Sequence, residues 1–287
     1  MAITSDWHIH TKCSCDSACM EFEDLVQDAK AIGLTDFGVT DHYHSSLQEG
    51  DIAASRQEYE KTLLNHPELK GHFHFGIEAT IMSKWETEKI ARKEYDEAPI
   101  YGIRSGGPKN APICFDFDDE FLEKYKIEYV VAGMHWPMYC DLDLNSIIKE
   151  YHRQYMFAAT NPHTTIMAHY LWWDSCLFRN NWNLPDFENP FADFSVIPNS
   201  MKDELKAALL ENNVAFELNY GTFCDSPSDE RFLIPYLEWV AELQQSGVKI
   251  SMGSDSHAPK LSQRCDYKKV DQMCARYGIK TSEFFKL

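Results

Sequence analysis

A His-x-His pair near the N-terminus is the first arrangement in the sequence that could do chemistry. His8 and His10 are two residues apart, and on a β-strand such residues point to the same side. Two imidazoles on one side can bind one metal ion. The chain has 12 histidines and contains two further pairs of this kind, His42-x-His44 and His72-x-His74. The spacing by itself is therefore a weak signal.

Other metal-binding or polar side chains follow short apolar runs at regular places along the chain. These segments read Thr40-Asp41-His42, Gly76-Ile77-Glu78, Gly133-Met134-His135, Met167-Ala168-His169, Glu217-Leu218-Asn219 and Gly253-Ser254-Asp255-Ser256-His257. A single histidine in such a place is most often a structural residue, but a series of them after successive runs is not explained that way. Parallel barrels hold their active sites at the carboxyl ends of their strands, so we expect these side chains to converge.

Seven apolar runs rich in Val, Ile and Phe are the predicted strands that would position these residues. They cover residues 2–9, 36–40, 72–77, 128–133, 164–168, 214–218 and 248–252. Apolar residues three and four positions apart predict helices between them, at 21–32, 52–64, 117–125, 146–159, 201–211, 232–245 and 267–277. Gly33 and Gly247 follow two of these helices, as C-terminal glycines do. The alternation predicts an α/β fold with a closed or nearly closed parallel barrel.

The whole chain, residues 1–287, is predicted to form one domain. Residues 83–112 and 170–199 lack a clear period and are expected to be loop insertions over the mouth of the barrel. No Gly-x-Gly-x-x-Gly or P-loop motif follows a predicted strand, which argues against the common nucleotide-binding sites.

Composition limits the partners and the location. The chain has 27 Lys and Arg against 45 Asp and Glu, a formal net charge of −18, which disfavours nucleic acids and anionic membranes as partners. No apolar run reaches the roughly 18 residues of a membrane span, and no signal peptide is recognisable, so we expect a cytoplasmic protein. Nine cysteines without a Cys-x2-Cys pair favour free thiols in a reducing compartment. The oligomeric state is left open.

The motifs together, in their order over residues 6–257, resemble the PHP (polymerase and histidinol phosphatase) family. They are Asp-x-His-x-His, Thr-Asp-His, Gly-Ile-Glu, Gly-x-His, Ala-His and Gly-Ser-Asp-Ser-His. The resemblance implies a distorted seven-stranded (β/α)7 TIM-like barrel with a trinuclear metal centre at the carboxyl ends of the strands.

Carried over residue by residue, the resemblance implies three divalent metal ions. The first would be bound by His8, His10, Glu78 and Asp255. The second would share Glu78 and add His135 and His169. The third would be bound by Asp16, His42 and His257. Nitrogen and oxygen ligands of this kind accept zinc, manganese or iron.

The resemblance is strongest to stand-alone histidinol-phosphate phosphatases of histidine biosynthesis. It implies a metal-dependent phosphatase for a small phosphomonoester, with a hydroxide that bridges two metals about 3.5–4 Å apart as the nucleophile. Glu78, Asp255 and His257 are the expected catalytic residues. Those enzymes commonly carry an Arg shortly after the Asn that corresponds to Asn219, and this sequence has none there. The expected substitutes for binding the substrate phosphate are loop residues: Arg104, Lys109 and Arg179.

Several neighbours of these residues carry weaker expectations. Asp6 and Asp41 precede predicted ligands and could accept hydrogen bonds from ligand imidazoles. Cys13 and Cys15 are expected to be non-ligands, and His44 is expected to tolerate replacement by alanine. Aromatic residues that follow ligands could line the substrate pocket, namely Trp136, Trp172 and Trp173.

Three alternatives stay open. One is a PHP-type nuclease or phosphodiesterase, which the acidic charge and the lack of a basic stripe disfavour. Another is an amidohydrolase-like metal hydrolase, which also begins with His-x-His but ends in a lone Asp and often uses a carboxylated Lys. Glu78 and the Asp255-Ser256-His257 segment disfavour this reading. The third is a metal-binding module without catalysis, against which the complete set of ligands argues.

Overall fold

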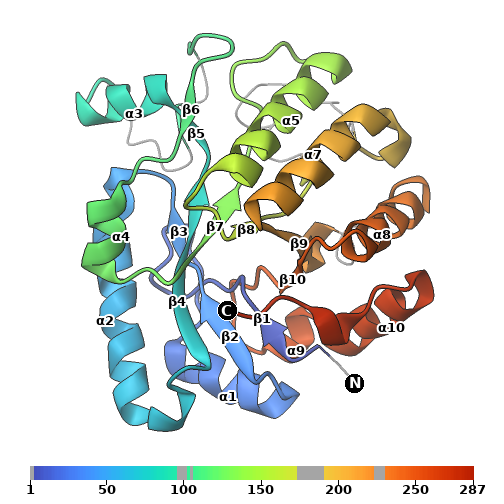
Figure 1. Cartoon of the computed structure of the whole chain (residues 1–287). Helices are drawn as coiled ribbons and strands as arrows, with labels where there is room; N and C mark the ends of the chain where they lie inside the picture. The colour runs from blue at the N-terminus through green and yellow to red at the C-terminus, as the bar shows by residue number, and fades with distance from the viewer. Residues whose placement is uncertain (1–2, 96–101, 104–105, 173–190, 223–229) are drawn as a thin grey trace.

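Seven parallel strands form a nearly closed barrel with helices around it (Figure 1), which confirms the predicted fold. The computed structural model describes residues 3–95, 102–103, 106–172, 191–222 and 230–287. The strands, in their order around the sheet, are β1 (Ser5–Asp6), β2 (Asp36–Val39), β4 (Phe73–Thr80), β7 (Tyr129–Gly133), β8 (Ile166–Met167), β9 (Ala215–Asn219) and β10 (Ile250–Gly253). Each overlaps one of the seven predicted runs.

Backbone hydrogen bonds between the two ends of the chain bring the first and last strands together. The segment after β1 stays extended beside the segment after β10: Asp255 N donates to His8 O (2.8 Å), and His10 N donates to Ser256 O (2.9 Å). Two motifs almost 250 residues apart in sequence are thereby held side by side.

Apolar side chains form a separate cluster between the strands, and the C-terminal segment covers the amino end of the barrel. The cluster consists of Trp7, Tyr129, Val131, Ile166, Ala168 and Ala215. Phe285 packs against it; its backbone N donates to Ile250 O (2.7 Å), and its carbonyl oxygen accepts from Trp7 Nε1 (2.9 Å). Ile250 is the first residue of β10, so this contact leaves the carboxyl ends of the strands for polar side chains.

Seven helices agree with the predicted ones. They are α1 (Phe22–Ile32), α2 (Glu49–Asn65), α4 (Asp119–Tyr125), α5 (Leu144–Thr160), α7 (Asn199–Asn212), α8 (Glu230–Gln245) and α10 (Tyr267–Tyr277). In α1 the buried residues Phe22, Leu25, Val26 and Ala29 are spaced by three and four, which puts them on the face toward the sheet. The helix ends at Gly33, whose φ of 83° is the left-handed conformation that glycine adopts without strain.

The structure corrects the prediction for residues 83–112, which are not a simple loop. They include α3 (Lys84–Ala91), and β5 (Met82–Ser83) pairs with β6 (Ile113–Cys114) in an antiparallel ribbon. A reciprocal cap starts α3: the Ser83 side chain accepts from Glu86 N (3.2 Å), and the buried Glu86 carboxylate accepts from Ser83 N (3.0 Å). In the other predicted insertion, 170–199, most residues lie outside the described part.

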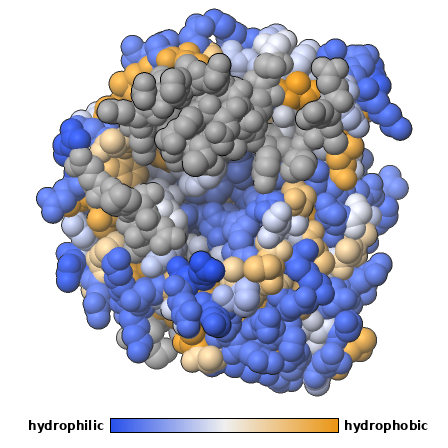
Figure 2. Space-filling view, turned by 180° about the vertical axis from the view of Figure 1, so that it is seen from behind, coloured by the Kyte–Doolittle hydropathy of each residue, from blue (hydrophilic) through white to orange (hydrophobic). Residues whose placement is uncertain are grey.

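The remaining elements of the described residues are short. They are β3 (His42–Tyr43), α9 (Leu261–Arg264) and the 3₁₀ turns Ser46–Gln48, Pro67–Leu69, Phe194–Val196 and Thr281–Glu283. None of the helices in the described part of the chain combines the length and the apolar character needed to cross a membrane. The cytoplasmic location stays a prediction. On the face opposite to that of Figure 1, the surface is hollowed at its middle, and hydrophilic residues lie within the hollow (Figure 2).

Candidate metal centre

The nine side chains predicted as metal ligands lie together at the carboxyl ends of the strands. They are His8 and His10 after β1, Asp16 in the next loop, His42 in β3, Glu78 in β4, His135 after β7, His169 after β8, and Asp255 and His257 after β10. Seven of these side chains are at most 10% exposed, whereas Asp255 is 21% and His257 is 36% exposed. The cluster is therefore buried on all sides except the one that Asp255 and His257 border.

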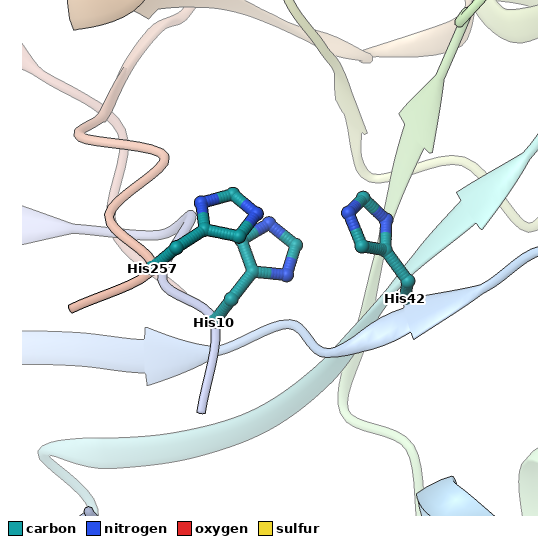
Figure 3. Close-up of side chains that lie close together, drawn as sticks. All are labelled: His10, His42 and His257. Carbon is teal, nitrogen blue, oxygen red and sulfur yellow. The ribbon is translucent and has the colours of Figure 1, made fainter. Parts of the chain in front are cut away.

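Rings from three separate elements meet in this cluster (Figure 3). The rings of His10 and His257 stack with centroids 4.1 Å apart, and the centroid of the His42 ring lies 4.3 Å from that of His10. Such crowding of imidazoles in a buried place has no apolar packing role, and it is typical of metal sites.

Glu78 lies at the middle of the cluster and presents each oxygen to a different set of histidines. Its Oε1 lies 3.0 Å from His135 Nε2 and 2.8 Å from His169 Nε2. Its Oε2 lies 2.8–3.4 Å from nitrogens of His8, His10 and His42. A carboxylate in this position can bind two cations at once, because each oxygen has its own lone pairs.

The first predicted ligand set has the spacing of a single metal site. His8 Nε2 and His10 Nε2 lie 3.1 Å apart, and each lies 3.2–3.5 Å from Asp255 Oδ1 and from Glu78 Oε2. Ligands placed tetrahedrally around zinc at its usual bond lengths are about 3.4 Å apart. These four residues could therefore hold one cation.

The other two predicted sets are less separate. Asp16 Oδ2 lies 2.6 Å from His257 Nε2 and 3.3 Å from His42 Nε2, as expected for a third site. His42, however, also groups with Glu78 and His135, and His10 groups with His42 and His257. The nine residues form one continuous cluster.

Buried atoms without partners indicate that the cluster suits a cation. Among the described residues, Asp16 Oδ1, His10 Nδ1 and His169 Nδ1 are buried and make no hydrogen bond. A buried acceptor that is left unsatisfied costs about 1–3 kcal/mol, and more when it is charged. Imidazole nitrogens and carboxylate oxygens suit zinc, manganese and iron, so the residues present fit such ions.

Without metal, the cluster is a set of opposing charges. Burial would raise the pKa of the Glu78 carboxyl, but the charges of His42, His135 and His8 outweigh it and hold that pKa well below its usual range. Burial would lower the pKa of His42, but the charge of Glu78 and the hydrogen bond with Asp16 raise it to about 10.

The pKa values of two other imidazole rings, those of His10 and His135, are lowered. Burial, together with the charges of His257 and His42, lowers the pKa of His10 to about 3. Burial also lowers the pKa of His135 to about 4, although Glu78 opposes this shift. In the metal-free chain some rings therefore hold protons at neutral pH, and others are neutral.

Metal binding is expected to release protons and to strengthen as pH rises. His42 has a pKa of about 10 without metal, so between pH 6 and 8 it is protonated, and a cation must displace that proton. The apparent affinity for Mn²⁺ should rise about tenfold per pH unit for each proton displaced. Calorimetric titrations in buffers of different ionisation enthalpy measure the protons released. An affinity that does not change between pH 6 and 8 would contradict the direct role of His42.

Glu217 contacts the cluster but is absent from the predicted ligand set. Its Oε1 accepts from His8 Nδ1 (2.6 Å), and its Oε2 accepts from His169 N (2.6 Å) and Asn219 Nδ2 (3.2 Å). Because the carboxylate can only accept, His8 must carry its proton on Nδ1, which leaves Nε2 free for a metal. The period of two along β9 places Glu217 and Asn219 on the same side, and this signal could have identified the residue.

Asp6 and Asp41 do not have the predicted role of contacting ligand rings. Asp6 accepts from the backbone N of His8 (3.2 Å) and of Ser254 (3.1 Å), and Asp41 accepts from the backbone N and the hydroxyl of Thr11. Both carboxylates therefore hold the backbone of the ligand-bearing loops.

Two glycines of the motifs make room for carboxylates. A Cβ atom at Gly133 would collide with Glu78 Oε1, and one at Gly253 would collide with Glu217 Oε1. The Gly-x-His and Gly-Ser-Asp segments thus owe their glycines to the close approach of these side chains.

Of the predicted phosphate-binding residues, Lys109 lies in the part of the chain that the structure describes. Lys109 Nζ forms an ion pair with Asp141 (2.6 Å), and both side chains are exposed. Arg104 and Arg179 lie outside the described residues. The phosphate-binding role of all three stays a prediction.

Two of the three tryptophans that were expected to line the substrate pocket lie in the described part of the chain, and they differ in their distance from the cluster. The Trp172 ring lies 5.7 Å from that of His169 and 6.2 Å from that of His135, next to the cluster. Trp136 is buried and packs edge-on against Tyr139. The remaining one, Trp173, lies outside the described residues.

A sequence profile of the PHP domain matches residues 6–170. The chain belongs to the PHP family. The matched part holds seven of the nine clustered residues, and Asp255 and His257 lie beyond it. A comparison with curated proteins gives no match.

Two solved structures are similar to this PHP chain along most of their length. One is a histidinol phosphate phosphatase from Lactococcus lactis in complex with zinc, L-histidinol and phosphate; it is 18% identical, with a TM-score of 0.62, over 97% of this chain and 95% of that one. The other is assigned as a histidinol phosphatase from Listeria monocytogenes; it is 15% identical, with a TM-score of 0.53, over 90% of this chain and 96% of that one. At these identities the likeness shows the fold. Family and fold together support a metal-dependent phosphoesterase.

Proposed function

We propose that this chain is a phosphatase that hydrolyses a small phosphomonoester with the help of three divalent metal ions. The observation that carries the proposal is the position of Glu78, whose two oxygens each face a separate set of histidines at 2.8–3.4 Å. A bridging carboxylate between imidazole groups is typical of sites that hold neighbouring cations.

The nine clustered residues would divide among the ions as their positions allow. His8, His10, Glu78 and Asp255 would hold the first. Glu78, His135 and His169 would hold the second. Asp16, His42 and His257 would hold the third. When bound, such ions lower the pKa of a water molecule that attacks phosphorus and neutralise charge on the phosphoryl oxygens.

Hydrogen bonds from His8 and His257 to other groups of the chain fix which ring nitrogen of each histidine carries a proton. Glu217 keeps the Nδ1 proton on His8, and His257 donates its Nδ1 proton to the backbone oxygen of Asp255 (2.8 Å). Each of the two rings then presents Nε2 to the cluster. The partly exposed Asp255 and His257 border the open side, so a phosphate ester would reach Glu78 past them.

Charge favours a small substrate. Three divalent ions would bring six positive charges against the carboxylates of Asp16, Glu78, Asp255 and Glu217, so the loaded site would attract a phosphate. The chain as a whole has a net charge of −18 and would repel a polynucleotide. Screening limits the overall field to about 8–10 Å at physiological salt, so a small ester feels mainly the ions.

Histidinol phosphate is the first substrate to test, because the similar Lactococcus lactis structure is a histidinol phosphate phosphatase. The residues after Asn219 in the described part are Tyr220, Gly221 and Thr222, without the Arg that such enzymes commonly have there. The proposal is therefore stated for small phosphomonoesters as a class.

We expect the protein reconstituted with Mn²⁺ or Zn²⁺ to hydrolyse at least one small phosphomonoester and to lose this activity with a chelator. The measurement compares initial rates on histidinol phosphate, nucleoside monophosphates, sugar phosphates and a single-stranded oligonucleotide. Degradation of the oligonucleotide without turnover of any monoester would contradict the proposal and favour a nuclease.

A further inference from the structure

We propose that Thr80 and His44 form a hydrogen-bonded chain that orients His135 for metal binding, so that both are positioning residues. This inference rests on the proposed function, because it assigns His135 to a metal. The juxtaposition on which it depends is the contact of one threonine hydroxyl with two buried imidazoles at the edge of the cluster.

The backbone brings these residues into register. The short strand β3 pairs with β4 so that His42 lies opposite Glu78 and Tyr43 lies opposite Ala79. With a period of two, His44 follows His42 on the side where Thr80 follows Glu78. The His-x-His and Glu-x-Thr segments therefore face each other at two successive positions, of which the first is part of the cluster.

The side chains complete a continuous path. His44 Nδ1 lies 2.6 Å from Thr80 Oγ1, and Thr80 Oγ1 lies 3.0 Å from His135 Nδ1. His135 Nε2 then lies 3.0 Å from Glu78 Oε1. His44 is 1% exposed and Thr80 is 2% exposed, so water does not compete for these hydrogen bonds.

One arrangement of protons makes the path continuous when His135 binds a metal, and we assign that arrangement. Its Nε2 must offer a lone pair, so its Nδ1 carries the proton and donates to Thr80 Oγ1. The Thr80 hydroxyl has one proton of its own, which it donates to His44 Nδ1. His44 thus accepts at Nδ1 and carries its proton on Nε2. The burial and this contact do not fit the expectation that His44 can be replaced freely by alanine.

Replacement of Thr80 separates this role from simple packing. Thr80→Val keeps the shape of the side chain and removes the hydroxyl, and Thr80→Ser keeps the hydroxyl. We expect Thr80→Val to weaken metal binding about 10–100-fold, as is typical when a partner of a ligand histidine is lost. Thr80→Ser should bind metal within about threefold of the wild type. His44→Phe keeps a ring but removes the acceptor, and its effect should be intermediate, because Thr80 can still accept from His135.

The experiment measures Mn²⁺ and Zn²⁺ dissociation constants by competition with a chromogenic chelator, and metal content after gel filtration. Thr62→Val is the matched control, because Thr62 is buried and its hydroxyl bonds only within α2, to Glu58 O. In histidine-labelled, zinc-loaded protein, ¹⁵N spectra should show the Nδ1–H form of His135, and this form should be lost or mixed in Thr80→Val.

We expect the wild type and Thr80→Ser to bind metal with similar and highest affinity. His44→Phe should bind more weakly, and Thr80→Val should bind most weakly. Equal affinities of Thr80→Val and wild type would overturn the inference and leave the proposed function intact. A wild-type protein that binds no metal would overturn both. If Thr80→Val does not fold, His44→Phe with wild-type affinity and an unchanged His135 spectrum overturns the inference.

Discussion

Glu78→Gln is expected to lower phosphomonoester turnover by about 10³-fold or more, beyond the 10–100-fold effect usual for partners of metal ligands. The amide has nearly the same shape, but one of its two ends is an NH₂ group that repels a cation. Whichever way it turns, one set of histidines loses its carboxylate oxygen, since both oxygens of Glu78 face ring nitrogens within 3.4 Å. Initial rates and the metal content of the same preparation measure the effect.

Glu128→Gln is a matched control for this change. Glu128 is an exposed glutamate next to the amino end of β7, where it accepts from His74 Nδ1 (2.7 Å) and Phe75 N (3.1 Å), away from the cluster. It should keep wild-type metal content and turnover. A Glu78→Gln protein that is as active as Glu128→Gln would show that no bridging carboxylate is needed.

Glu217→Gln should be the next most damaging substitution, with a loss of about 10–100-fold in metal affinity and a comparable loss of turnover. Glu217 accepts from three donors, one at Oε1 and two at Oε2. A glutamine has a single acceptor oxygen, so its NH₂ group must face either His8 Nδ1 or the donors at the other end. In the first case His8 loses the carboxylate that holds its Nδ1 proton, and in the second the backbone N of His169 loses its acceptor.

The readout for Glu217→Gln is the metal dissociation constant at fixed pH, with thermal unfolding of the metal-free protein as the test of folding. An unfolding temperature close to that of the wild type together with weaker metal binding is the expected pattern. Wild-type metal affinity in this variant would contradict the role of Glu217 in orienting His8.

The barrel could be predicted because its signals are local. Each predicted strand is a short segment rich in apolar residues, each flanking helix has its own period, and α1 has its terminal glycine in the expected left-handed conformation. The short strand β3 could not be predicted, because two residues have no period and become a strand only through pairing with β4. The helix α3 was missed because it is eight residues long and mostly polar.

The site was predictable to the extent that its residues follow strands. The nine clustered residues converge because each lies in a parallel strand near its carboxyl end or in the segment that follows such a strand. The roles of Glu217 and Thr80 depend on which ring nitrogen each oxygen reaches, and that follows from the register between strands distant in sequence. The predicted contacts of Asp6 and Asp41 with ligand rings were wrong for the same reason: adjacency in sequence does not say to which side a carboxylate turns.

The most direct test of a three-metal centre is the number of ions that one chain holds. Protein purified without chelator, and apoprotein reconstituted with Mn²⁺ or Zn²⁺ and freed of excess metal, are analysed for metal per chain while turnover of a phosphomonoester is followed during the titration. We expect a stoichiometry that approaches three, with activity rising until the last ion is bound. A stoichiometry of one or fewer after reconstitution would contradict the trinuclear centre.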